Sequence, residues 1–306
     1  SIAPGAPWLG SGASLTASRT LPAQGSHSTL GFGYPVGGMS TRVSGTTGAF
    51  ADFDAVMQQN PAAIGGTRTM IAAVQTEPEL RTLRIGSVAE RTRSQRLPLL
   101  GVIFPAGRGI AVGLSAASFL DRSYSMRTRG TVQLGTASLN TNDQLDVRGA
   151  IGALRGNIGW QMNRRMRVGI GAQLYTGDNL VARERVFADT TAFGSLIDTS
   201  QVTYLGSALT AGAEVRLLAG FAASASYRRG GGLDAKVRDT VRTSAHVPDM
   251  ASASLRYEGI PGSVFAVAVE QVSWSRMRGL GSTLVNAQDA TNWRVGAETT
   301  GPRWRG

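Results

Sequence analysis

The chain has 306 residues, a formal net charge of +11 and no cysteine. A disulfide framework and a thiolate metal site are therefore excluded. The length suits one large β-barrel or two small domains. No apolar run approaches the roughly 18 residues that a transmembrane helix needs.

The positive charge comes almost entirely from arginine, because Lys236 is the only lysine. The arginines are dispersed along the chain and do not form a basic stripe with stacking aromatics, so no nucleic-acid partner is expected. Four of them would face the lumen of a barrel: Arg155, Arg228, Arg256 and Arg294. On a lipid-facing surface each would cost roughly 2–4 kcal/mol at the midplane.

Residues 1–66 are rich in Gly, Ser, Thr, Ala and Pro and lack a strand pattern. The first residues show no charged and apolar leader, so a signal peptide has been removed or lies outside the given sequence. Asp52 and Asp54 can cap local turns or helix starts, and Asn60 before Pro61 favours a turn. A compact coil with one short helix near 53–58 is expected.

From residue 67 onward, segments with alternating apolar and polar or small residues recur. In 166–175 the apolar residues occupy every second position: Val168, Ile170, Ala172 and Leu174. Successive β side chains point to opposite faces, so such a segment is a strand with one apolar face. Ten strands are predicted in this way: 67–76, 95–104, 109–121, 147–161, 166–175, 201–215, 220–228, 250–257, 263–274 and 291–298.

The predicted connections alternate between short and long. The short turns are 105–108, 163–164, 216–219, 259–262 and 299–302, and the long polar loops are 122–146, 176–200, 229–249 and 275–290. Outer-membrane barrels have this one-sided loop pattern. A soluble β-sandwich is the alternative, but it does not require such a pattern. The sequence therefore predicts an all-β, antiparallel transmembrane barrel.

Several short motifs carry a resemblance to a known family. They are Met39-Ser40, Gly48-Ala49-Phe50-Ala51-Asp52 and Asn60-Pro61-Ala62-Ala63 before the first strand, then Phe119-Leu120-Asp121-Arg122-Ser123-Tyr124, Trp274-Ser275 and Val295-Gly296-Ala297-Glu298. In this order the chain resembles the FadL-type outer-membrane family from about Gly31 onward. That family contains transporters of long-chain fatty acids and other hydrophobic compounds, and some secretion-associated relatives.

The resemblance implies a 14-stranded barrel plugged by an N-terminal hatch, hence an extension and hatch in 1–66 and a barrel in 67–306. The hatch residues singled out are Asp52, Asp54, Asn60, Pro61 and Ala62. It also implies lateral exit through a kink in the third strand, which here has no proline. About ten strands are visible and 303–306 look like the start of an eleventh, so C-terminal strands are expected to be missing.

The function implied is passive diffusion of long-chain fatty acids or similar molecules through a monomeric outer-membrane channel gated by the hatch. No cofactor is expected, and the partners would be outer-membrane lipid and the hydrophobic ligand. The ligand would enter by the loop 176–200, at Phe187, Phe193, Leu196 and Ile197, although loop-on-loop packing explains these side chains equally well. The alternative is a scaffold protein that partners a secretion system.

Catalytic motifs are poor, so the chain is not expected to be an enzyme. The only two histidines are His27 and His246, and no G-x-S-x-G nucleophile elbow occurs. The run Arg229-Gly230-Gly231-Gly232 lacks the Lys-Ser/Thr of a phosphate loop. A barrel-embedded hydrolase that uses His246 is a weaker alternative. Aromatic residues near strand ends are expected at the membrane interfaces: Tyr124, Trp160, Tyr175, Tyr204, Tyr227, Trp274 and Trp293.

Overall fold

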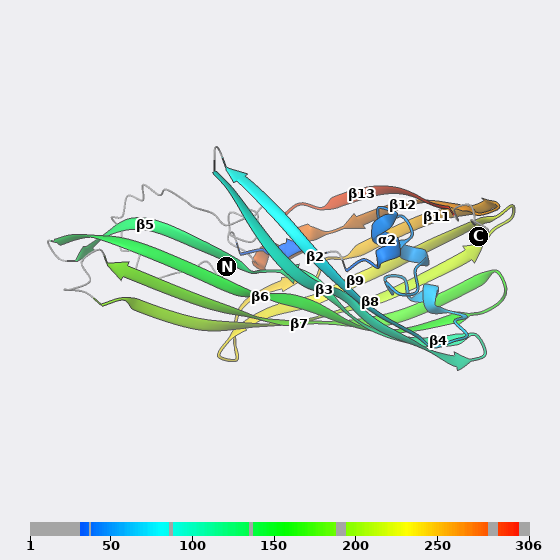
Figure 1. Cartoon of the computed structure of the whole chain (residues 1–306). Coiled ribbons are helices and arrows are strands. Elements are labelled where there is room, and N and C mark those ends of the chain that lie inside the picture. Colours follow the sequence, from blue (N-terminus) through cyan, green and yellow to red (C-terminus); the bar gives the residue numbers. More distant parts are fainter. Residues whose placement is uncertain are drawn as a thin grey trace.

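The structure is a computed structural model that describes residues 31–36, 38–85, 88–134, 137–187, 194–280 and 287–299. These residues build one elongated antiparallel sheet of thirteen strands, with short helices on one side (Figure 1). The strands are β1 (Tyr34–Pro35), β2 (Ile71–Ile85), β3 (Val88–Gly107), β4 (Ile110–Asp121), β5 (Tyr124–Leu134), β6 (Ala137–Gln161), β7 (Met166–Phe187), β8 (Leu196–Arg216), β9 (Phe221–Val237), β10 (Thr240–His246), β11 (Met250–Ile260), β12 (Ser263–Val272) and β13 (Ala290–Thr299). The helices are α2 (Thr41–Gly45) and the 3-10 helices η1 (Ala51–Phe53), η2 (Pro61–Ile64) and η3 (Trp274–Leu280).

Ten of the strands form the continuous path β13-β12-β11-β9-β8-β7-β6-β4-β3-β2, while β1, β5 and β10 pair at its side. Each strand on this path overlaps one of the ten segments predicted from the alternation, so the antiparallel all-β architecture is confirmed. The fourteen strands that the resemblance implies compare with thirteen in the described ranges. The predicted start of an eleventh strand at 303–306 lies outside them.

The two faces of the sheet differ as the alternation predicts. On β7, Ile170 is 64% exposed, whereas Tyr175, which belongs to the opposite row, is completely buried. We call the face that carries the short helices the inner face and the opposite one the outer face. The outer face exposes large apolar side chains, including Leu114, Leu154, Ile158, Leu174, Leu209, Leu255, Phe265, Val267, Trp293 and Val295. Within the described ranges, no helix has both the length and the apolar character needed to cross a membrane.

The long loops predicted from polarity are in fact largely strand. The segment 122–146 contains β5 and the first part of β6, 176–200 contains the ends of β7 and β8, and 229–249 contains β10. Polar residues are frequent in these strand extensions, and the long apolar alternation of the predicted strands is missing, although Leu233 and Ala235 of β9 are buried. Cross-strand pairs stabilise them instead, for example Arg185 of β7 with Asp143 of β6 at 2.7 Å.

The neighbouring strands β3 and β4 separate partway along their length. The two strands pair from Leu99 to Gly107, and beyond that point β3 pairs with β2 alone. The edge of β4 freed in this way is taken by β1, with Tyr34 opposite Asp121. In Figure 1 the cyan β2–β3 hairpin correspondingly turns away from the green strands. A short N-terminal strand therefore covers the position at which the wall opens.

Candidate functional site

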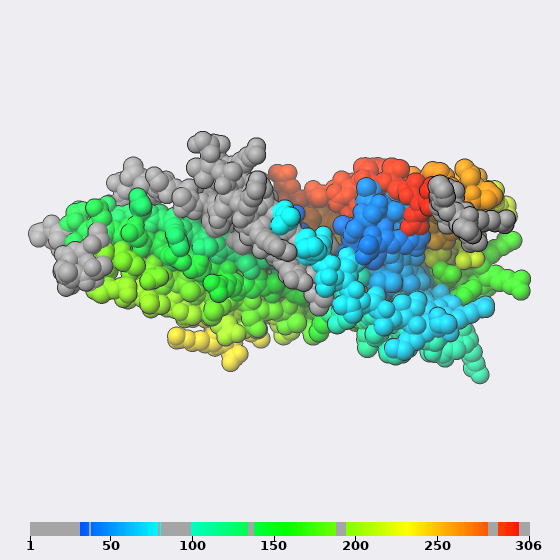
Figure 2. Space-filling model, viewed as in Figure 1, coloured from blue at the N-terminus to red at the C-terminus, as the bar shows by residue number. Residues whose placement is uncertain are grey.

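Residues 38–66 lie on the inner face and run from β13 back to β4, so the segment predicted as a hatch contacts most of the sheet. Figure 2 shows this blue segment between the red β13 and the cyan strands. Its helix α2 begins where the Ser40 hydroxyl accepts a hydrogen bond from the Val43 amide at 3.2 Å, a normal N-cap. At one end of the segment, Arg42 makes a two-point ion pair with Glu298 of β13, at 2.6 and 2.8 Å.

Asp52 is the central polar contact of this segment. Its carboxylate, 1% exposed, accepts hydrogen bonds from three serine hydroxyls at 2.7–3.1 Å: Ser226 of β9 and Ser252 and Ser254 of β11. The serines meet there because β9 and β11 pair with Ser226 opposite Ser252. Burial raises the pKa of Asp52 above its usual value, although the serine hydrogen bonds oppose that shift.

The other predicted hatch residues have two different roles. Asp54 acts locally, because its Oδ1 accepts from the Val56 amide at 2.7 Å and its Oδ2 from the Ser40 hydroxyl. Asn60 acts both locally and on the sheet. Its Oδ1 caps η2 by accepting from the Ala62 amide at 2.9 Å, while its Nδ2 donates to Ser224 of β9 at 2.7 Å. Pro61 occupies the first position of η2, where the missing N–H costs nothing.

η2 packs against a row of three glycines that are opposite one another in the sheet. Gly159 of β6 pairs with Gly169 of β7, and Gly169 pairs with Gly212 of β8. A β-carbon at Gly169 would lie 2.4 Å from the carbonyl carbon of Pro61, and one at Gly212 would lie 2.0 Å from Oδ1 of Asn60. We call Gly159, Gly169 and Gly212 the glycine row. The close approach of two backbones requires residues without a β-carbon at these positions.

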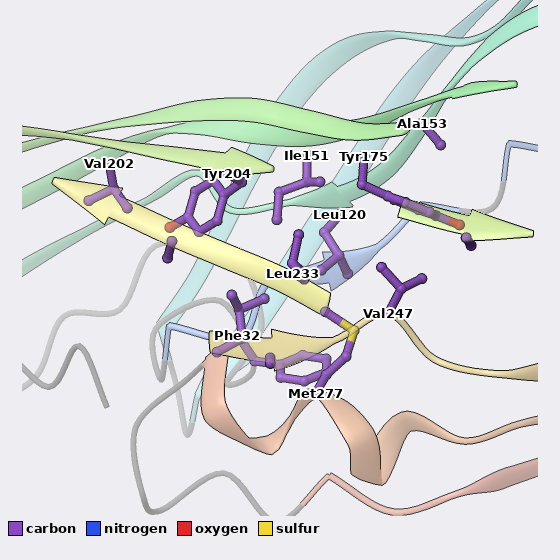
Figure 3. Packing of buried hydrophobic residues seen from close by; sticks show 14 residues of the cluster. Phe32, Leu120, Ile151, Ala153, Tyr175, Val202, Tyr204, Leu233, Val247 and Met277 are labelled. Carbon is purple, nitrogen blue, oxygen red and sulfur yellow. The ribbon is translucent and has the colours of Figure 1, made fainter. Parts of the chain in front are cut away.

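Beyond this contact region the inner face becomes apolar. We call the following buried residues the inner apolar cluster: Phe32, Leu120, Ile151, Ala153, Tyr175, Val202, Tyr204, Ala208, Leu233, Ala235, Ala245, Val247, Met277 and Leu280. Figure 3 shows Phe32 next to Met277, with Leu233 and Leu120 close by. The cluster thus joins the strands to η3 and to the N-terminal segment 31–36.

Three aromatic residues expected at the membrane interfaces lie in or against this cluster instead. Tyr175 and Tyr204 are buried in it, and Trp274 packs edge-on to Phe32 with ring centroids 6.2 Å apart. The two tyrosines belong to inward-facing rows of β7 and β8, and Trp274 begins η3 because β12 ends at Val272. Proximity to a strand end therefore predicted the wrong surroundings for all three. Trp160, Tyr227 and Trp293 are on the outer face, with 43%, 49% and 76% of their surface exposed.

Arg122 is a buried cation next to the inner apolar cluster. It follows β4 directly and is 6% exposed. Its Nη2 donates to the carbonyl of Gly31, and its guanidinium lies 4.7 Å from the ring centroid of Tyr204. Its Nη1 is buried without any hydrogen-bond partner, and no carboxylate among the described residues pairs with it. A buried, partly unsatisfied guanidinium is suited to an anionic ligand group.

The residues expected to admit a ligand are elsewhere. Phe187 ends β7, and Leu196 and Ile197 begin β8 at the far tip of the hairpin, 41% and 66% exposed. Phe193 lies outside the described residues. Their role in admitting a ligand therefore stays a prediction. Arg122 was identified from the sequence only as part of a family motif and not as a site residue. The available signal was a charged residue at the end of an apolar run.

No protein-family model matches the sequence, and no curated protein matches it either. Among solved structures, the crystal structure of a Pseudomonas aeruginosa FadL homologue is similar, with a TM-score of 0.53 and 13% sequence identity. The match covers 89% of this chain and 78% of that one. At this identity the likeness concerns the fold alone. The chain therefore has the FadL-type fold.

Proposed function

We propose that this chain is an outer-membrane channel for hydrophobic small molecules that carry a carboxylate, with long-chain fatty acids as the expected class. Residues 38–66 would be the hatch, and transport would be passive diffusion without a cofactor. The FadL-type fold and the apolar outer face support the membrane location, since lipid-facing rows of a barrel are apolar.

The substrate class is inferred from Arg122. A fatty acid has one anionic end and a long apolar chain. The unsatisfied Nη1 of Arg122 offers a donor for the carboxylate, and the inner apolar cluster offers a surface for the chain. The ligand would replace Phe32, because this side chain belongs to the N-terminal segment and not to the wall.

The route out of the site follows from the split between β3 and β4. Arg122 lies directly after the stretch of β4 that β1 covers. Release of residues 31–36 would expose both the guanidinium and the freed edge of β4. In this proposal the same movement opens the pocket and the side of the wall.

The test is native mass spectrometry and oleate binding with the protein purified from outer membranes in mild detergent. Arg122→Gln keeps hydrogen-bond donors but removes the charge. We expect it to weaken oleate binding by about ten- to hundredfold, because a hydrogen bond to a charged group contributes about 1.5–3 kcal/mol. Binding of methyl oleate should not change, which also reports that the variant is folded.

Arg148→Gln, at an exposed position of β6, is the matched control and should bind oleate normally. Equal binding of oleate and methyl oleate by the unchanged protein would contradict the carboxylate site. A barrel that retains no lipid but carries a stoichiometric second protein would favour the scaffold alternative and contradict transport.

A further inference from the structure

Two hollows adjoin on the outer face, and both are lined by Arg229. The first has a volume of about 620 Å³ and is lined mainly by apolar residues of β6 to β9. The second, of about 610 Å³, is lined by Arg229, Arg276, His246 and the glycines 230–232. Neither hollow is lined by Arg122 or by a member of the inner apolar cluster.

The first hollow is a consequence of register. Gly156, Ala172, Leu209 and Arg229 are successive partners across β6, β7, β8 and β9, and the adjacent row is Ile158, Ile170, Ala211 and Tyr227. The small residues Gly156 and Ala172 leave a trough beside Ile158 and Ile170, which are 50% and 64% exposed. A trough of this kind can hold hydrocarbon chains.

The second hollow has an excess of positive charge. Asp249 is the acidic residue next to it, and its charge is already engaged: it pairs with Arg276 at 2.9 Å and accepts from the Gly230 amide at 2.8 Å. Arg229 is exposed and forms no ion pair with any described residue. Arginine binds phosphate with two parallel hydrogen bonds, which makes this hollow complementary to a phosphate group.

The position of Arg229 along the membrane normal also fits a phosphate group on a lipid. On β9 the outward side chains run from Phe221 near the strand start to Tyr227, and Arg229 is the next outward residue. The eight residue steps from Phe221 to Arg229 span roughly 20 Å of height at the usual rise and tilt of barrel strands. Arg229 would therefore lie near the upper edge of the apolar band, at the level of lipid headgroups.

We propose that the outer face binds one anionic phospholipid, with its acyl chains in the trough at Gly156 and Ala172 and its phosphate on Arg229, flanked by Arg276 and His246, where no headgroup cation offsets the phosphate charge. This inference rests on the membrane location of the proposed function. It does not depend on fatty acid transport.

The experiment is native mass spectrometry of the protein released from nanodiscs that contain equal amounts of palmitoyl-oleoyl phosphatidylglycerol and phosphatidylcholine. We expect one phosphatidylglycerol to be retained. Arg229→Gln and, separately, Ala172→Leu should each reduce its retention about tenfold, since one removes the phosphate donor and the other fills the trough. Arg242→Gln, an exposed arginine on β10 that lines neither hollow, is the control and should have no effect.

Two further probes identify the ligand class. Palmitoyl-oleoyl glycerol, which lacks the phosphate, should not be retained, and inorganic phosphate should not displace the phospholipid. Equal retention of the two phospholipids, unchanged retention in Arg229→Gln, or displacement by inorganic phosphate would each overturn the inference and leave the membrane location intact. Failure of the protein to insert into nanodiscs would overturn both.

Discussion

Two parts of the N-terminal segment, residues 38–66 and residues 31–36, are held on the inner face by different means. Residues 38–66 are held by specific polar contacts and by the close approach of η2 to the glycine row. Residues 31–36 are held by Phe32 in the inner apolar cluster, by short strand pairing and by the one side-chain hydrogen bond described above, from Arg122 to the Gly31 carbonyl. Hydrogen bonds and backbone approach require one geometry, whereas apolar packing accepts another apolar group of similar volume. The first region is therefore suited to a permanent attachment and the second to exchange with a ligand.

The largest effect is expected from a substitution in the glycine row, which should loosen the attachment of residues 38–66. We expect Gly169→Ala to displace η2, because the added methyl group would overlap backbone atoms of Pro61 and Ala62. Overpacking of this kind costs about 1–3 kcal/mol, and the backbone contact places the cost near the upper value. Amide hydrogen exchange of residues 56–66 measures it.

Gly156→Ala is the matched control, since its β-carbon would meet only a Leu114 methyl group at 3.7 Å. Normal protection of residues 56–66 in Gly169→Ala would show that η2 is not held by close packing.

The second prediction concerns the exchangeable region. Phe32→Ala should leave residues 38–66 protected but increase the affinity for oleate about tenfold, because the ligand no longer has to displace a buried aromatic ring worth about 1.5–3 kcal/mol of burial. Titration of a fluorescent fatty acid gives the affinity. Tyr34→Ala, two residues away and 42% exposed, should change it little. Weaker binding in Phe32→Ala would mean that Phe32 contributes to the ligand site.

The third prediction tests whether the polar region depends on pH. The pKa of Asp52 is raised in the folded state by burial, so the attached segment binds a proton more tightly than the detached one. Protection of residues 50–60 should therefore increase as pH falls through the raised pKa towards the usual value of 3.8. Asp52→Asn should remove this dependence. Hydrogen exchange corrected for the intrinsic pH effect measures it, and a slope that survives in Asp52→Asn would assign the proton to another group.

The smallest effect is expected at Arg42 and Glu298. Both side chains are partly exposed, at 43% and 30%, so solvent screens the pair and its contribution should not exceed about 1 kcal/mol. A double-mutant cycle with Arg42→Gln and Glu298→Gln, read by exchange of α2, gives the coupling energy. A larger value would make β13 a principal anchor of the segment.

The sequence predicted the strands that cross the apolar band but not their full length. Alternation identifies a strand only where its two faces meet different surroundings, as in 166–175 with Ile170 outside and Tyr175 inside. β5 and the start of β6 have polar residues on both faces, so they read as loop.

The site could be predicted only in part, for a related reason. The inward rows placed Ser224, Ser226, Ser252 and Ser254 on the correct face, but their partner Asp52 is at least 172 residues away in sequence. The glycine row likewise depends on the register of three strands, which the spacing of glycines in one strand does not determine. Asn60 and Pro61 were identified because their chemistry is local.

The length of β6 affects the surroundings of the channel mouth. The strand has 25 residues, whereas roughly 9–11 suffice to cross a bilayer. The excess corresponds to roughly 35 Å of height at the usual strand rise and tilt. Together with β5 and β7 it would form a rigid hydrophilic collar that keeps lipid away from the mouth and presents the opening to solutes well above the bilayer surface.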